Sequence, residues 1–486
     1  MTAATSAARA FALAVASMLT LPATTAAAQL AYAGHLGGSA TDQAFSVAVD
    51  AEGNTYVAGS TESASFPVVN ALQPALKGAT DAFVAKISAD GTTLLYATYL
   101  GGSKLDAAYG IAVDASGSVY VAGATSSSDF PVTPGVVQSH LKGALFDAFV
   151  AKISPAGTLV YATYLGGSYV DIADAIAVDA ARNAYVVGYS CSYDFPTKKA
   201  FQPFLKGGPP GCFAGQDAFV AKLDANASSL VYSTFFGGTG KDEATALALD
   251  TQGRAFVAGY SASNDLPVAG FALTPFRGGR DAFVARFDAD GALGYASYLG
   301  GTADETATGI ALGAAGDVFV AGYTASPDFP LANAHQGALQ GIEDGFVARI
   351  AFTQTSASLL YSTYLGGGDA DRLQAIAADA SGGAYVAGYS ESLDFPTVAP
   401  AQAALGGPRD AIVARFDPAG VPTYATFLGG SDSDSGWGLA LHAGALGAVD
   451  VDVAGETLST DLGTAGAFQP NAQGAADGFA AKVTSP

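Results

Sequence analysis

The chain has 486 residues, of which 50% are hydrophobic and 13% are charged. This composition excludes an intrinsically disordered chain, and two cysteines are too few for a disulfide-dense scaffold or a multi-cysteine zinc protein. The formal net charge of −22 argues against nucleic acid or anionic lipid as the main partner.

The first 28 residues have the organisation of a secretory signal peptide. One basic residue, Arg9, precedes an apolar run over 10–21, and small residues ending at Ala28 fit a cleavage site before Gln29. The run is short for a bilayer span, and no later segment is an uninterrupted apolar run of spanning length. We therefore expect an exported protein, residues 29–486, that is not an integral membrane protein.

Three sequence blocks recur seven times along the chain, and successive copies of the first block are 63 to 70 residues apart. One block is Asp-Ala-Phe-Val-Ala-Lys, a second is Tyr-Ala-Thr-Tyr-Leu-Gly-Gly, and a third ends in Tyr-Val-Ala-Gly. Such a period indicates a repeat architecture. The first block begins at Asp81, Asp147, Asp217, Asp281, Asp344, Asp410 and Asp477.

Each repeat predicts four short strands. In the first repeat, 47–50 alternates in polarity, 51–54 supplies a turn, and 55–58, 81–87 and 94–100 have extended patterns. No segment keeps a helical period for ten residues. Seven four-stranded units of this kind predict an all-β protein, a single seven-bladed β-propeller.

The two ends of the chain predict how the ring closes. The sequence after the signal peptide opens with a fourth-strand block at 31–38, and the chain ends with a third-strand block at 477–482. The last repeat therefore lacks an outer strand that the first residues can supply. We expect the N-terminal strand to pair with the C-terminal blade and leave no unpaired edge.

These blocks, together with a recurring Asp-Phe-Pro, resemble the bacterial seven-bladed β-propeller repeat family, SBBP, over essentially the whole chain after residue 28. The resemblance implies a propeller in the periplasm, outside the cell or at the cell surface of a bacterium. It brings no established activity and no catalytic motif. The blades are expected at about 40–102, 103–167, 168–238, 239–301, 302–367, 368–430, and 431–486 plus 30–38.

An acidic residue stands four positions after each Gly-Gly pair. It lies in the turn into the next first strand, on the face that also carries connections of about 20 residues, where binding residues usually lie. These carboxylates stabilise turns in one hypothesis and bind Ca²⁺ or another ligand in the other. We expect no cofactor and keep Ca²⁺ as the alternative. The row is Asp42, Asp106, Asp171, Asp242, Glu305, Asp371 and Asp434.

Each Asp-Ala-Phe-Val-Ala-Lys block also ends on a base, such as Lys86 or Arg349. Because period-two geometry puts the initial Asp and the final base on opposite faces of the strand, the two do not form one local ion pair. We expect the base to reach a carboxylate or carbonyl of a neighbouring blade.

The third repeat holds both cysteines, Cys191 and Cys212, in one long connection. In an oxidising compartment this pair predicts a disulfide that closes a loop of about 20 residues. With no histidine near that loop, a zinc site has little support.

Catalytic motifs are weak throughout: there is no Gly-x-Ser-x-Gly, Walker loop or His-Glu-x-x-His. The non-repeated Trp437, His442, Arg372, Lys198 and Lys199 are candidates for an off-centre pocket. We therefore favour a monomeric, non-catalytic module that binds a protein or glycan on the long-loop face. The alternative is a secreted polysaccharide hydrolase or lyase that uses carboxylates at the channel mouth.

Overall fold

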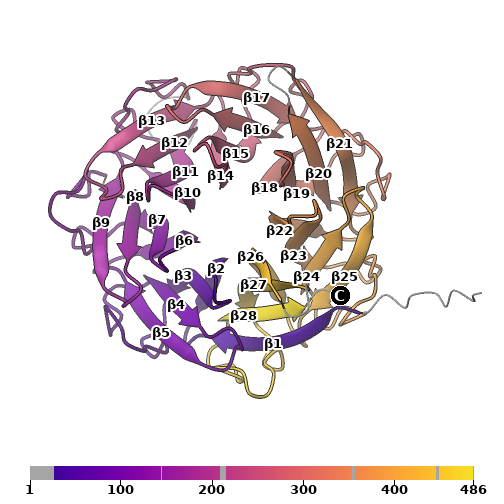
Figure 1. Cartoon of the computed structure of the whole chain (residues 1–486), viewed down its shortest axis with the longest axis horizontal. Coiled ribbons are helices and arrows are strands. Elements are labelled where there is room, and N and C mark those ends of the chain that lie inside the picture. Colours follow the sequence, from indigo (N-terminus) through magenta and orange to yellow (C-terminus); the bar gives the residue numbers. More distant parts are fainter. Residues whose placement is uncertain (1–26, 144, 208–214, 353–355, 445–447, 485–486) are drawn as a thin grey trace, which may run out of the picture.

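The computed structural model describes residues 27–143, 145–207, 215–352, 356–444 and 448–484. These residues form 28 strands and no helix, arranged as seven four-stranded sheets around a central axis (Figure 1). The predicted all-β, seven-bladed propeller is confirmed. The expected signal sequence falls mainly on residues 1–26, which lie outside the described residues.

Each blade runs outward from the axis in strand order. The first blade contains β2 (Asp42–Val49), β3 (Thr55–Thr61), β4 (Asp81–Ile87) and β5 (Leu94–Leu100). The second to fourth blades contain β6 (Asp106–Val113), β7 (Val119–Thr125), β8 (Asp147–Ile153), β9 (Leu159–Leu165), β10 (Asp171–Val178), β11 (Ala184–Ser190), β12 (Asp217–Leu223), β13 (Leu230–Phe236), β14 (Asp242–Leu249), β15 (Ala255–Ser261), β16 (Asp281–Phe287) and β17 (Leu293–Leu299). The fifth and sixth contain β18 (Glu305–Leu312), β19 (Val318–Thr324), β20 (Asp344–Phe352), β21 (Ala357–Leu365), β22 (Asp371–Ala378), β23 (Ala384–Ser390), β24 (Asp410–Phe416) and β25 (Pro422–Leu428).

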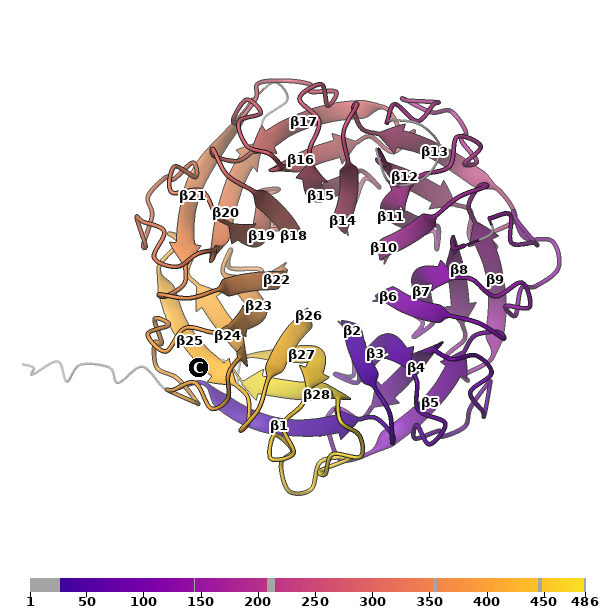
Figure 2. The same ribbon diagram turned by 180° about the vertical axis from the view of Figure 1, so that it is seen from behind.

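The seventh blade joins the two ends of the chain. Its order is β1 (Gln29–Leu36), β28 (Asp477–Thr484), β27 (Val449–Thr457) and β26 (Asp434–Ala443). β1 pairs antiparallel with β28 from Gln29 opposite Thr484 to Leu36 opposite Gly478. Figures 1 and 2 show β1 as the outer strand of the yellow blade. The predicted ring closure is confirmed.

The two faces of the disc differ in the length of their connections. Tight hairpins join the first strand to the second and the third to the fourth on one face, the hairpin face. The long connections between second and third strands share the other face with the turns into the next blade. Parallel bridges such as Thr80–Leu105 and Arg280–Asp304 join the ends of five of the long connections to the next blade's turn. We call this the long-loop face.

The core lies between blades. Each blade buries one set of alternating side chains against the blade before it and the other set against the blade after it. Tyr56 and Val84 of the first blade, for example, pack with Ile111, Phe149 and Ile153 of the second. The hydrophobic core therefore forms a continuous ring and holds the inner strands close to the axis.

The bases at the end of the third strands correct one prediction. Lys86 Nζ lies 3.0 Å from Asp50 Oδ2 of its own blade. The same nitrogen lies over the ring of Tyr56, 4.7 Å from the ring centroid. The third strand ends at the same face as the first, so the carboxylate closing the first strand of the same blade is in reach. A neighbouring blade supplies only carbonyls in the contacts described, such as Pro418 O at 2.7 Å from Arg349 Nη1.

A β-bulge interrupts the first strand of every blade. In β2 the register shifts between Ala44 and Ser46, leaving Phe45 without a partner in β3. The bulge brings the carbonyl of Gln43 against Gly59, where a Cβ would lie 1.8 Å from that oxygen. The final glycine of the Tyr-Val-Ala-Gly block is therefore required by a close backbone approach, and it recurs because the bulge recurs.

We expect Gly188→Ala to lower the free energy of unfolding by about 1–3 kcal/mol. A Cβ at this position would lie 2.0 Å from the carbonyl oxygen of Ile172, a backbone atom that can move only with its strand. Urea denaturation gives the measurement, with Gly337→Ala as the control because no atom lies within 4 Å of a Cβ there. Equal midpoints for the two variants would contradict the role of the bulge.

Candidate functional site

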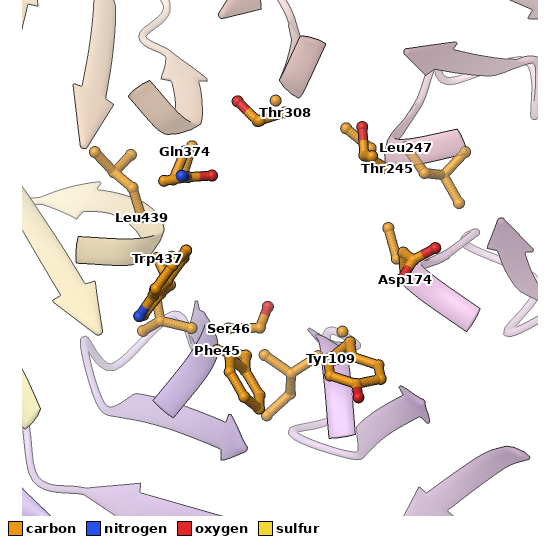
Figure 3. Close-up of a pocket in the computed structure, with 18 of the residues that line it drawn as sticks. Phe45, Ser46, Tyr109, Asp174, Thr245, Leu247, Thr308, Gln374, Trp437 and Leu439 are labelled. Atoms are coloured by element: carbon orange, nitrogen blue, oxygen red, sulfur yellow. The ribbon is translucent and has the colours of Figure 1, made fainter. Parts of the chain in front are cut away.

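The bulge residues of the seven first strands line the axial channel (Figure 3). They surround a cavity of about 250 Å³. Six different residue types occupy this position across the seven blades, whereas the strands around it are nearly repeated. The members of this channel ring are Phe45, Tyr109, Asp174, Thr245, Thr308, Gln374 and Trp437.

Small residues beside each bulge explain why one side chain per blade enters the channel. A Cβ at Gly309 would lie 2.9 Å from the backbone N of Ile376 in the next blade, and one at Gly438 would lie 3.0 Å from Ser46 Cα. Inner strands of adjacent blades therefore touch backbone to backbone at this level. The bulge residue is excluded from that contact and projects toward the axis.

The channel ring has an apolar arc and a polar arc. Trp437, Phe45 and Tyr109 come from the adjacent seventh, first and second blades, and the rings of Phe45 and Tyr109 lie 5.3 Å apart. The remaining four positions, in the third to sixth blades, are polar (Figure 3). The Thr245 and Thr308 hydroxyls donate to carbonyls of the following blades at 2.6 and 2.7 Å, which fixes their orientation.

The junction of the third and fourth blades gathers two carboxyl groups and two tyrosines. Glu243 accepts hydrogen bonds from Tyr260 Oη at 2.8 Å and Gln216 Nε2 at 3.0 Å, and burial raises its pKa. Burial, and then the charge of Glu243, raise the pKa of Asp174 well above its usual range. Burial and the same two carboxyl groups raise the pKa of the Tyr189 hydroxyl. These shifts favour the neutral, protonated form of the two carboxyl groups and of Tyr189 at the edge of the channel.

Arginines cover the neighbouring second-strand tyrosines. Arg372 lies 4.4 Å from the ring centroid of Tyr323 and pairs with Glu343 at 2.6 Å, while Arg409 lies 4.3 Å from the ring of Tyr389. At the equivalent positions the seventh, first and second blades carry no tyrosine. We call this asymmetric set on the long-loop side the mouth cluster. Its members are Tyr189, Glu243, Tyr260, Arg280, Tyr323, Arg372, Tyr389 and Arg409.

The residues that the sequence suggested for an off-centre pocket lie in different parts of the structure. Trp437 lines the channel and Arg372 belongs to the mouth cluster. His442 instead lies toward the hairpin face, with Nδ1 2.9 Å from Asp452 Oδ2. Lys198 pairs through its backbone with Ser233 of an outer strand. The structure does not bring these residues into one pocket.

The acidic row lies at the blade junctions, and its side chains are buried. Asp171 Oδ2, for example, accepts hydrogen bonds from the Gly167 N–H at 2.7 Å and the Ser192 hydroxyl at 2.8 Å. A second carboxylate approaches from the preceding blade: a Cβ at Gly366 would lie 2.7 Å from Asp344 Cγ and 2.8 Å from Asp371 Oδ2. Each such pair encloses the first glycine of a Gly-Gly turn.

These seven carboxylates are not brought together. Each of Asp42, Asp106, Asp171, Asp242, Glu305, Asp371 and Asp434 begins the first strand of a different blade. Within the described ranges, no group of three or more His, Cys, Asp or Glu is arranged to hold a metal ion. Ca²⁺ binding stays a prediction.

The predicted disulfide also stays a prediction. Cys191 is buried directly after β11, at the start of its long connection. Cys212 lies outside the described residues.

A protein-family model described as a beta-propeller repeat, SBBP, matches residues 29–67, 95–131, 160–196, 231–267 and 360–396. Five copies of the SBBP beta-propeller repeat are therefore recognised in this chain. The resemblance drawn from the repeated blocks is confirmed.

The chain is also similar to individual known proteins. Regulatory protein FlaEY of Caulobacter vibrioides is 26% identical over 341 residues, which cover 67% of this chain and 34% of FlaEY. The chain thus spans about a third of that relative. The Pan2 WD40 domain of Neurospora crassa gives a TM-score of 0.44 at 9% identity, covering 95% of this chain and 98% of that one. A gluconolactonase from Xanthomonas campestris gives a TM-score of 0.35 at 11% sequence identity. That match covers 77% of this chain and 86% of the gluconolactonase chain.

We expect the melting temperature to be higher at pH 5 than at pH 8. Burial raises the pKa of Asp171 and Glu305 to about 7, and of Asp371 and Asp434 to about 6. Unfolded carboxyl groups titrate at about pH 4. Between that pH and the raised pKa values, the folded state binds more protons than the unfolded state, so the free energy of unfolding falls as the pH rises through this interval.

Scanning calorimetry across this range checks the expectation. Carboxylates with a lowered pKa, such as Asp114 at about 2, lose their stabilising effect only below about pH 4, so they do not reverse the trend. A melting temperature that stays constant or increases from pH 5 to pH 8 would contradict it.

Proposed function

We propose that the chain is an exported, non-catalytic module that holds a protein or glycan partner on its long-loop face. One observation carries the proposal: in a nearly repeated scaffold, two sets of side chains that depart from the repeat, the channel ring and the mouth cluster, lie along the axial channel and on its long-loop side. Binding sites on rigid scaffolds commonly lie where variable residues converge.

Exposed apolar side chains on the long loops support this choice of face. Leu393 is 84% exposed, Phe204 and Ile342 are 74% exposed, and Phe271 is 67% exposed. They belong to the long connections of four adjacent blades, the third to the sixth, which also carry the mouth cluster. Exposed apolar surface of this kind is typical of an interaction site. We call these four residues the apolar loop tips.

A polysaccharide hydrolase or lyase is the second candidate, and one observation favours it. Burial raises the pKa values of Asp174 and Glu243, and the charge of Glu243 raises that of Asp174 further; no other blade carries a carboxyl group at either position. A pair of carboxyl groups with perturbed pKa values suits acid–base catalysis.

We expect replacement of the apolar loop tips to weaken binding to cell envelopes of the producing bacterium at least tenfold, because the partner loses its contact area. The variant is Phe204→Ser, Phe271→Ser, Ile342→Ser and Leu393→Ser. Envelopes treated with protease or with periodate show whether the partner is a protein or a glycan.

A matched variant on the hairpin face serves as the control. It carries Leu95→Ser, Val160→Ser, Leu360→Ser and Val421→Ser, which are exposed near the starts of fourth strands. Equal binding by both variants would contradict the choice of face. New reducing ends released from envelope polysaccharide by the wild type, and lost in Asp174→Asn, would favour the enzyme.

We also expect the full chain, produced in a bacterial host, to be found outside the cytoplasm with Gln29 as its first residue. A leader with one positive charge, a short apolar run and small residues at its end is recognised and cleaved during export. Intact-mass spectrometry of the cell fractions gives the start site. A cytoplasmic chain that retains residues 1–28 would overturn the export proposal.

A further inference from the structure

We propose that the axial channel is a subsite for one neutral sugar unit, which lies between the apolar arc and the polar arc of the channel ring. This inference rests on the proposed function and names the ligand class at its centre. It is argued from the chemistry of the two arcs, the size of the cavity and the charge around it.

The three aromatic rings of the apolar arc form one wall of the channel. Trp437 makes an edge contact with Tyr389 at 6.5 Å between centroids, and Phe45 and Tyr109 form a tilted pair at 5.3 Å. These contacts hold the rings at the channel while leaving them partly exposed to it. A sugar ring presents C–H groups on one face, and such a face packs on aromatic side chains, which are rigid and bury large areas.

The polar arc supplies hydrogen-bonding groups across the channel. Thr245 and Thr308 are held by their bonds to neighbouring carbonyls, and their oxygens keep lone pairs as acceptors. Gln374 offers both a donor and an acceptor. Within the described part of the chain, Asp174 Oδ2 has no hydrogen-bond partner although it is buried from solvent. A sugar hydroxyl can both donate and accept, so it matches this mixed set.

Cavity size and charge narrow the ligand further. A cavity of about 250 Å³ is below the usual range for drug-sized ligands, about 300–1,000 Å³, so it suits one ring rather than an oligosaccharide. Burial, and then the charge of Glu243, raise the pKa of Asp174, which favours the neutral form of this carboxyl, a form that can donate to a neutral acceptor. The net charge of −22 disfavours a phosphorylated or acidic sugar.

The chain contains a built-in reporter for this site, because Trp437 is its only tryptophan. The experiment titrates the purified protein with glucose, galactose, mannose, xylose and N-acetylglucosamine and follows tryptophan emission. We expect at least one sugar to shift the emission saturably. Tyr109→Ala removes part of the apolar wall and Gln374→Ala removes a polar partner, and each should weaken that sugar at least tenfold.

Val160→Ser, on the hairpin face, is the control and should leave the titration unchanged. Melting temperatures confirm that each variant is folded, and if Tyr109→Ala does not fold, Gln374→Ala decides the result by the same criterion. No emission shift with any of the five sugars, or a shift unchanged in the folded ring variants, would overturn the inference. If envelopes still bind at the loop tips in that case, the proposed function stands; if they do not bind, both fail.

Discussion

The pairing of β1 with β28 is the constraint on which the rest of the structure depends. The seventh blade reaches the four strands of the other six only by joining strands separated by nearly the whole sequence, so this pairing ties the two ends of the chain into one blade. The seventh blade, completed in this way, contributes Trp437 and lies beside the first blade with Phe45. The apolar side of the channel is therefore built across the closure.

A local device, the bulge with its facing glycine, then gives every blade one residue for the channel. Gly59 and its equivalents allow a carbonyl to approach, the small residues beside the bulge allow the inner strands to meet, and the bulge side chain is directed to the axis. Stability and function are separated by this arrangement. The repeated positions maintain the ring, and the bulge position can change from blade to blade without disturbing it.

The sequence was sufficient for the architecture, because repeated blocks specify strands, turns and closure by local pattern alone. It did not reveal the channel ring as a set. Strict alternation assigns Phe45 and Asp174 to a packed face of the strand, and only the register shift seen in three dimensions turns them to the axis. The sequence did contain a signal, because the position of Phe45 and Asp174 varies from blade to blade while the residue that follows it stays small. The acidic row was found by its spacing, but its burial between blades depends on the adjacent blade and could not be predicted from one repeat.

Amide hydrogen exchange of the exported protein tests the closure most directly. If β1 completes the seventh blade, the amides of Ala33–Leu36 exchange as slowly as those of the equivalent outer strands β5 and β9, because all of them are bonded to a third strand in the same way. Exchange of 33–36 at the rate of an unstructured chain, while β5 and β9 stay protected, would contradict a ring closed by the two ends of the polypeptide.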